Sequence, residues 1–401
     1  MRPAPPRSRR QILALVALAS LLAPALPAFG QDVAVGDTLT LVERQLGIPA
    51  HPAPGDSHVS LRFESGSKAT ALDLDAASGW VRIAGETFDG GSGSGWISRK
   101  YIASTEPATG DLVQDALAWC PAKGSSAPHP AGRLRIATWN LGNLHAVSGR
   151  SIFPDSVRRT DLDYDRLRCY VRLFDPDILA VQEVDGEEAL ARVVDTDVYA
   201  VHVSSRAATG LGGRQNTGFA YKRGLAVTER PDFTALDVSG GLRHGTRLDV
   251  TLGGTTYKLM SVHLKSGCFS NGTNNADACN ELAQQLPILE SWIDEAASAP
   301  EPFLVLGDFN RRLNEELDIA WAELDDATPP NADLTSVTAE MPISCRGNEF
   351  TRFIDHIVVD KRAAAAVELS SFRHVTFRQA DSDDWDRISD HCPVVVDLWG
   401  G

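Results

Sequence analysis

Several residue types are scarce in this sequence, and each shortage excludes a class of protein. Lysine and arginine number 38 against 53 aspartates and glutamates, which gives a formal net charge of −15 at pH 7. Such a chain has no general electrostatic attraction for nucleic acid, so activity on nucleic acid would need a local cationic patch or a bound metal. Past residue 30, no apolar run approaches the roughly 20 residues that a membrane-spanning helix needs. No Cys-x-x-Cys or cysteine–histidine spacing indicates a zinc site.

The overall amino-acid composition is that of an ordinary globular protein. Hydrophobic residues make up 43% and charged residues 23% of the 401 residues, which excludes disorder, coiled coil and collagen. The length predicts two or three domains, with at least one large core.

Residues 1–30 have the pattern of a secretory signal peptide. Four arginines precede an apolar run over 12–22, and the small residues Ala28 and Gly30 follow at a spacing that signal peptidase accepts. We therefore predict a mature chain that begins near Gln31 and is exported to the periplasm or the extracellular space. Residues 8–13 also resemble a twin-arginine export signal, and both routes remain open.

Six cysteines in an exported chain predict disulfide bonds. Cys268 and Cys279 bracket a polar stretch that contains asparagine and glycine, and we predict that this pair closes a loop. The pairing of the other four stays open from the sequence; they are Cys120, Cys169, Cys345 and Cys392.

Residues 32–104 consist of short β-type runs broken by turn residues, which predicts a small β-barrel. The runs are 38–42, 58–63, 69–74, 80–83 and 96–102. The segments 79–83 and 95–102 resemble the closing strands of bacterial Src-homology-3-like domains. That resemblance implies a domain that binds a cell-wall ligand or packs beside an enzyme, whereas Trp80 and Trp96 alone could equally be core aromatics.

Residues 105–131 are rich in proline, alanine, glycine and serine and contain Cys120, which predicts a linker. The pattern changes after this linker. In residues 132–399, buried apolar strands alternate with amphipathic helices, which predicts an α/β domain. The expected strands are 134–138, 178–182, 217–221, 246–251, 257–263, 303–307, 353–359 and 394–398, and the expected helices are 164–174 and 281–297.

Polar or ionisable side chains stand at the ends of these apolar strands. They are Asn140, Gln182, Glu183, His263, Asp308, Asn310, Asp355 and His356, with Asp390 and His391 just before the last strand. Because burying unpaired carboxylates and imidazoles is costly, we expect them to share one partly dry site. Oxygen ligands without thiolates favour Mg²⁺, Mn²⁺ or Ca²⁺, and a hard cation with imidazoles suits phosphoryl chemistry. A serine hydrolase is disfavoured because Ser266 lies in no Gly-x-Ser-x-Gly elbow.

Six motifs together resemble the endonuclease/exonuclease/phosphatase superfamily. They are Trp139-Asn140, Gln182-Glu183, Val262-His263-Leu264, Gly307-Asp308-Phe309-Asn310, Ile354-Asp355-His356 and Ser389-Asp390-His391. The resemblance spans residues 133–398 and keeps the order of the family. It implies a four-layered α/β sandwich, with two packed β-sheets and outer helices, and cleavage of a phosphate ester that depends on a divalent metal, most commonly Mg²⁺.

The resemblance also implies roles for single residues. Glu183 would be the principal metal ligand, with Asn140 and Asp390 near the metal or the phosphate.

His391 would be the general base or acid, oriented by Asp355, and Asp308 would position water or assist the leaving group. Asn310 and His263 would bind phosphoryl oxygens. Which of the two histidines, His263 or His391, transfers the proton stays open. His356 is placed outside the site.

Cationic residues near these motifs could form a local rim for a polyanionic substrate. The candidates are Arg214, Lys222, Arg243, Lys265, Arg311 and Arg312.

We therefore expect an exported metal-dependent phosphodiesterase, in first place a nuclease acting on DNA or RNA. No aromatic hairpin is evident that would insert into a bilayer, which disfavours a lipid substrate. The alternatives are an enzyme for a phospholipid or small phosphate ester, and a catalytically idle cell-wall-binding protein.

Overall fold

The computed structural model describes residues 33–43, 46–75, 79–106, 117–130, 132–205, 214–272, 275–345, 351–378, 381 and 385–400. The predicted signal peptide lies outside these ranges. Within them, no helix is long and apolar enough to cross a membrane.

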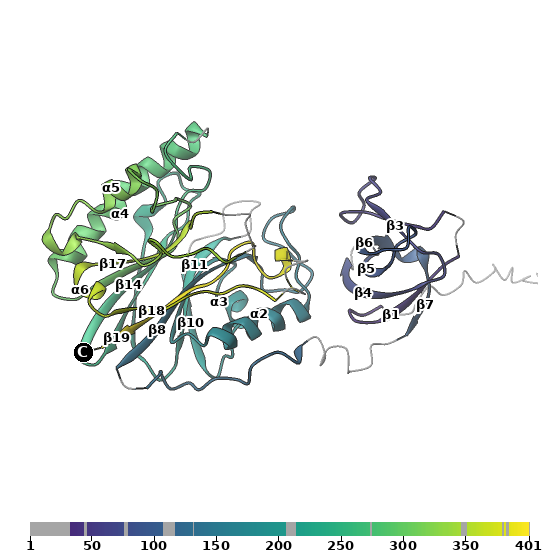
Figure 1. Ribbon diagram of the computed structural model, residues 1–401, viewed down its shortest axis with the longest axis horizontal. Coiled ribbons are helices and arrows are strands. Elements are labelled where there is room, and N and C mark those ends of the chain that lie inside the picture. Colours follow the sequence, from purple (N-terminus) through teal and green to yellow (C-terminus); the bar gives the residue numbers. More distant parts are fainter. Residues whose placement is uncertain are drawn as a thin grey trace, which may run out of the picture.

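The N-terminal part is an antiparallel five-stranded sheet in the order β6-β5-β4-β1-β7, with a separate β2–β3 pair (Figure 1). The strands are β1 (Thr38–Leu41), β2 (Ile48–Ala50), β3 (Leu61–Phe63), β4 (Lys68–Asp75), β5 (Trp80–Glu86), β6 (Ser92–Ser98) and β7 (Ile102–Glu106). Alternate residues of β1, β4 and β5 point inward and form a small core of their own, to which Leu39, Val81 and Ile83 contribute fully buried side chains.

Two details of this part differ from the sequence prediction. The single run expected over 96–102 is divided, because β6 ends at Ser98 and a 3₁₀ turn, η1 (Arg99–Tyr101), precedes β7. β7 pairs with β1 as far as Glu106, two residues into the stretch predicted as linker.

Trp96 is 9% exposed and belongs to the core, whereas Trp80 is half-buried and contacts the His51 ring edge-on at 5.1 Å.

The larger part contains two six-stranded sheets, in the orders β10-β11-β9-β8-β19-β18 and β12-β13-β14-β15-β17-β16. The first sheet has β8 (Arg133–Leu144), β9 (Ile178–Val184), β10 (Tyr199–Val203), β11 (Asn216–Lys222), β18 (Val367–His374) and β19 (Val394–Trp399). The second has β12 (Ala226–Phe233), β13 (Gly245–Leu252), β14 (Thr255–His263), β15 (Phe303–Asp308), β16 (Thr335–Ser336) and β17 (Asp355–Val359).

These sheets pack face to face and helices cover their outer faces (Figure 1). The helices α2 (Asp161–Phe174) and α3 (Glu187–Arg192) pack on the first sheet, and α4 (Ala276–Ser298) and α5 (Ile319–Leu324) on the second. A short helix, α6 (Lys361–Ala364), and the 3₁₀ turns η2 (Thr234–Leu236), η3 (Pro330–Ala332) and η4 (Trp385–Arg387) complete the described elements. The predicted four-layered α/β sandwich is confirmed.

Strand β8 illustrates why the central strands are apolar on both faces. Ile136 packs between the two sheets, while Ala137 and Trp139 face the outer core that contains α2. Because both faces are buried, such strands are near-continuous apolar runs.

Capping residues set the helix starts. Thr160 and Asp163 form a capping box, so α2 begins at Asp161, three residues before the predicted start. The Asn275 side chain accepts from the Ala278 amide and begins α4 within the polar loop, five residues before the predicted start.

All six cysteines are in disulfides: Cys120–Cys169, Cys268–Cys279 and Cys345–Cys392. The pair predicted from the sequence is present. Cys120 ties the segment before β8 to α2, and Cys345–Cys392 joins the segment before β17 to the segment before β19.

Candidate active site

The register of the strands brings the motif residues to one edge of the sandwich. Asn140 pairs with Gln182 across the parallel strands β8 and β9. His263 pairs with Asp308 across β14 and β15, and Asp308 pairs with Asp355 across β15 and β17.

A pocket of about 450 Å³ opens at this edge. Of the predicted site residues it is lined by Glu183, His263, Asp308, Asn310, Asp355, Asp390 and His391. Asn140 lies beside it, fully buried.

Asp308 lies at the centre of the site. Its Oδ2 accepts from the side-chain amide of Asn140 at 3.0 Å and from that of Asn310 at 3.1 Å, and its Oδ1 accepts from the Asn310 backbone at 2.7 Å. The same Oδ2 lies 3.5 Å from Nε2 of His263 and 3.8 Å from Nε2 of His391. Burial raises the pKa of Asp308 to about 7, with Asp355 adding to the rise.

His391 is oriented by Asp355, whose Oδ2 lies 2.7 Å from Nδ1 of the imidazole. Burial lowers the pKa of His391, but the carboxylates of Asp355 and Asp308 outweigh it and raise that pKa well above its ordinary value. The Nε2 atom, on the far side of the ring, faces Asp308 and the pocket. This arrangement fits a proton-transfer histidine with a fixed tautomer.

Glu183 occupies the end of β9 in a left-handed backbone conformation, with φ of 60°. Its Oε2 accepts from the Asn143 amide at 2.9 Å, and its Oε1 lies 3.7 Å from Nε2 of His263. Burial raises the pKa of Glu183, and the charge of Asp390 raises it further. A divalent cation would relieve this crowding of negative charge, because four carboxylates, of Glu183, Asp308, Asp355 and Asp390, line the same pocket.

Glycine is required at two positions beside these residues. A Cβ on Gly307, whose φ is 142°, would lie 2.0 Å from the carbonyl oxygen of Val262, so only glycine lets β14 and β15 pair just before Asp308. Gly142 has a φ of 55°, and a Cβ there would meet Asp390 at 3.2 Å.

A buried arginine that the motifs do not include holds the Asp390 segment in place. Arg159 donates to the carbonyl oxygens of Leu141, Arg387 and Ile388 at 2.8–3.0 Å. The Ser389 hydroxyl donates to the Asn140 carbonyl at 2.6 Å. The end of β8 and the loop before β19 are therefore joined, and no spacing in the sequence indicated Arg159.

The predicted cationic rim is only partly present. Lys222 is buried and pairs with Asp175 and Asp177, Arg311 is buried and pairs with Asp318, and Lys265 pairs with Glu281. Lys222 and Arg311 were wrongly predicted as rim residues, since buried carboxylates neutralise both.

Arg243 and Arg312 do line the pocket, and so does Arg352, which the sequence analysis did not single out. Arg243 donates to the carbonyl oxygens of His263 and Leu264, which leaves it a positioning role. Arg214 is exposed and does not line the pocket.

His356 and Ser266 give no sign of catalytic use. His356 lies fully buried between the Thr338 hydroxyl and the Arg311 carbonyl, and burial lowers its pKa to about 4. Its predicted place outside the site agrees with these contacts. Ser266 lines the pocket, but no described histidine bonds to it.

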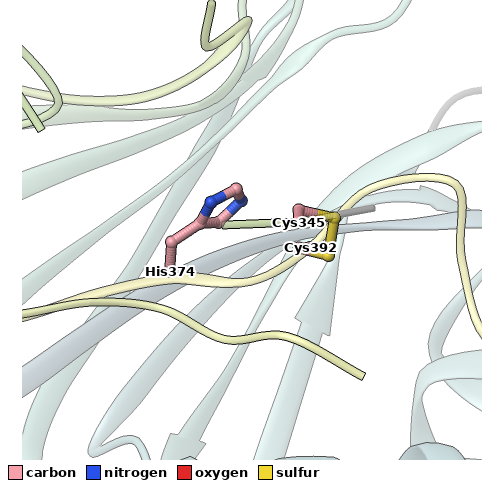
Figure 2. A group of neighbouring side chains, drawn as sticks. All are labelled: Cys345, His374 and Cys392. Atoms are coloured by element: carbon pink, nitrogen blue, oxygen red, sulfur yellow. A yellow bond between two sulfur atoms is a disulfide. The ribbon is translucent and has the colours of Figure 1, made fainter. Parts of the chain in front are cut away.

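Two cysteines of the pocket lining lie beside His374 (Figure 2). Their sulfur atoms are bonded to each other as Cys345–Cys392, so this group has no thiolate to offer a metal. Burial lowers the pKa of His374 to about 4, and its neutral ring packs on Phe353 at 4.9 Å.

Comparison with known sequences gives the family. The endonuclease/exonuclease/phosphatase family matches residues 137–391. The chain belongs to this family. Enzymes of the family hydrolyse phosphoric esters and depend on a divalent metal, and the chain is a phosphoric ester hydrolase. No curated protein sequence matches the chain.

Solved structures that match the chain include a humanized D. rerio TDP2, at 18% identity, covering 67% of this chain and 99% of that one, with a TM-score of 0.46. The 3′ phosphatase NExo from Neisseria, bound to a product DNA hairpin, is 16% identical with a TM-score of 0.45, covering 66% of this chain and 99% of that one. The human Nocturnin catalytic domain is 16% identical with a TM-score of 0.43, covering 67% and 94%.

Proposed function

We propose that the chain is an exported phosphodiesterase that depends on a divalent metal and hydrolyses nucleic acid, either DNA or RNA. The observation that carries the proposal is the Asp308 carboxylate between the Nε2 atoms of His263 and His391, with Asp355 behind His391. Hydrolysis of a phosphodiester needs proton transfer to and from oxygen, and it needs groups that stabilise negative charge on the phosphoryl oxygens. The side chains of this site suit both tasks.

Glu183, Asp390 and Asn140 would hold the metal. Their donors are carboxylate and amide oxygens, which suit Mg²⁺ best, with Mn²⁺ or Ca²⁺ as alternatives. When bound, the metal would neutralise phosphate charge and polarise the scissile bond.

The side chains of this pocket would do the remaining work. Asp355 fixes the Nδ1 proton of His391, so that Nε2 exchanges a proton with water or with the leaving oxygen. Asp308 would align the attacking water, and its placement is fixed by Asn140 and Asn310. His263 and Asn310 would bind the non-bridging phosphoryl oxygens.

The proposal extends to the whole chain. Residues 1–30 would direct export, and three disulfides are compatible with an oxidising compartment. Residues 32–104 would be a Src-homology-3-like barrel that binds a cell-wall ligand or packs against the enzyme, 105–131 a linker, and 132–399 the catalytic domain. Arg387, three residues before Asp390, pairs with Asp73 of β4 and with Asp163 of α2, which supports packing of the two parts.

A substrate panel tests the proposal. Residues 31–401 would be incubated with DNA, RNA, sphingomyelin and a chromogenic phosphodiester, with Mg²⁺ and with excess chelator. We expect nucleic-acid cleavage that the chelator and the His391→Ala substitution both abolish. Turnover of only the lipid or the small ester would replace the substrate, and no turnover of any of them would direct attention to the barrel as the functional part.

A further inference from the structure

Besides its four carboxylates, which we call the floor, the pocket is lined by residues of a different character. They are Phe269, Arg312 and Arg352, and none of them is in a family motif quoted above. Phe269 is 36% exposed although it is apolar, and the Arg312 side chain is 42% exposed. We call these three residues the aromatic wall.

The backbone of Phe269 is held in place from both sides. The neighbouring Cys268 is bonded to Cys279, and its carbonyl oxygen accepts from the buried Arg311 guanidinium at 3.0 Å. The Phe269 carbonyl accepts from the Arg312 amide at 2.8 Å. Since residues 311 and 312 directly follow Asn310, the position of Phe269 is fixed relative to the residues that would hold the phosphate.

The two arginines supply cations that the floor lacks. Arg312 has a single ion pair among the described residues, with Glu315 at 3.4 Å. Arg352 is exposed, and within the described part of the chain its guanidinium donates only to the Thr351 carbonyl, at 3.3 Å. The four carboxylates of the floor repel an anionic chain. The positive charges of Arg312 and Arg352 would offset part of that repulsion.

An exposed phenyl side chain on a fixed backbone, in a pocket that two arginines also line, matches one substrate chemistry well. A nucleobase stacks on an aromatic face only when that base is unpaired, and the adjoining phosphates pair with arginine. We propose that the aromatic wall is a subsite for an unpaired nucleotide next to the scissile bond, and that the enzyme prefers single-stranded over duplex nucleic acid. This inference rests on the proposed nuclease function.

Two polymers separate stacking from charge. One is a single-stranded oligodeoxynucleotide, and the other is a phosphodiester polymer of equal length in which a tetrahydrofuran abasic unit replaces every nucleoside. Phe269→Ala should lower kcat/KM for the oligonucleotide about 5- to 100-fold and leave that for the base-free polymer within about twofold. Phe269→Trp should retain activity on both. The matched control is Phe88→Ala, since Phe88 is 49% exposed and belongs to the N-terminal part, away from the pocket lining.

Salt dependence tests the arginines. With a phosphorothioate oligonucleotide that resists cleavage, Arg312→Ala and Arg352→Ala should each reduce the slope of log binding constant against log salt by about 0.7. Arg230→Ala, which removes an exposed arginine outside the pocket lining, should leave the slope unchanged.

The outcomes are distinguishable. If the wild type cleaves the oligonucleotide and Phe269→Ala cleaves it equally well, the subsite is refuted while the nuclease function stands. If Phe269→Ala loses the same factor on both polymers, the residue is structural and the subsite is again refuted. If the wild type cleaves neither polymer, the proposed function itself fails and this inference falls with it.

Discussion

Among single residues, Asp355 has the most specific consequence for catalysis. It raises the pKa of His391 through a 2.7 Å hydrogen bond and through its charge. Asp355→Asn removes that charge, so the pKa of His391 should fall, and the limb of the pH–rate profile that His391 governs should move to lower pH. We also expect kcat to fall by about 10²- to 10⁴-fold, as for His391→Ala.

The control is Asp333→Asn, which removes an exposed carboxylate paired with Lys361. A pH–rate profile of Asp355→Asn that coincides with that of the wild type would exclude Asp355 as the partner of His391.

The metal assignment rests on Glu183. Glu183→Gln keeps the shape of the side chain but removes the charge that crowds against Asp390. We expect the Mg²⁺ concentration for half-maximal activity to rise at least about tenfold while the thermal midpoint stays close to that of the wild type.

Glu187→Gln, on α3, is the matched control. An unchanged Mg²⁺ titration in Glu183→Gln would place the metal on other residues.

Sequence reasoning selected the polar residues of the pocket floor and, from the aromatic wall, Arg312 alone. The floor residues follow apolar strands, so the pattern marks them. The sequence around Lys222 and Arg311 looks like that around an exposed rim residue. In the fold, however, Asp177 neutralises Lys222 and Asp318 neutralises Arg311, and the local sequence does not show either pairing. Phe269 and Arg352 became candidates only when the fold placed them beside Asn310 and Asp355.

At the scale of elements, the Cys345–Cys392 disulfide connects the two segments that carry Asp355 and His391. Cys392 directly follows His391, and Cys345 precedes β17, which begins at Asp355. Replacing both cysteines by serine should therefore lower kcat at temperatures at which the protein stays folded.

The Cys120–Cys169 pair is a close control for this substitution. The two disulfides span 49 and 47 residues, so loop entropy predicts a similar loss of unfolding free energy for each, about 4 kcal/mol. Equal loss of kcat in both double variants would show that Cys345–Cys392 has no special effect on the site.

Helix α4 carries a carboxyl group, that of Glu290, whose ionisation opposes folding at neutral pH. Burial, together with the charges of Asp294 and Asp326, raises the pKa of Glu290 to about 8. Between about pH 4.5 and 8 the unfolded chain loses a proton that the folded chain keeps, so unfolding becomes easier as the pH rises.

Glu290→Gln should therefore raise the thermal midpoint at pH 8 and have little effect at pH 4. Glu295→Gln, on the same helix, is the control. A midpoint gain that is equal at both pH values would contradict this explanation.

The elements differed in how well the sequence predicted them, and the reason is burial. The eight expected strands of the sandwich all exist, and all of them lie inside a sheet, between two neighbouring strands. The strands that were missed are β10, β12, β16 and β18, which are the four edge strands of the two sheets. Edge strands expose one side to water and need no continuous apolar run, as the largely exposed β12 illustrates.

For the whole molecule, the sequence order of six motifs was sufficient to predict the sandwich. It was not sufficient to place the N-terminal sheet, because contacts between the parts join residues far apart in sequence, such as Arg387 and Asp73, some 300 residues away. Likewise, the net charge of −15 is a sum over the whole chain, and it does not reveal that Arg312 and Arg352 line the pocket.

The most direct test of the account is the rate at which residues 31–401 cleave a fluorescent single-stranded oligonucleotide before and after addition of chelator. The account predicts cleavage with Mg²⁺, loss of cleavage with chelator, recovery when Mg²⁺ is restored, and no recovery in His391→Ala. Cleavage that persists in excess chelator, or that His391→Ala retains in full, would contradict the assignment of this pocket as a metal-dependent phosphodiesterase site.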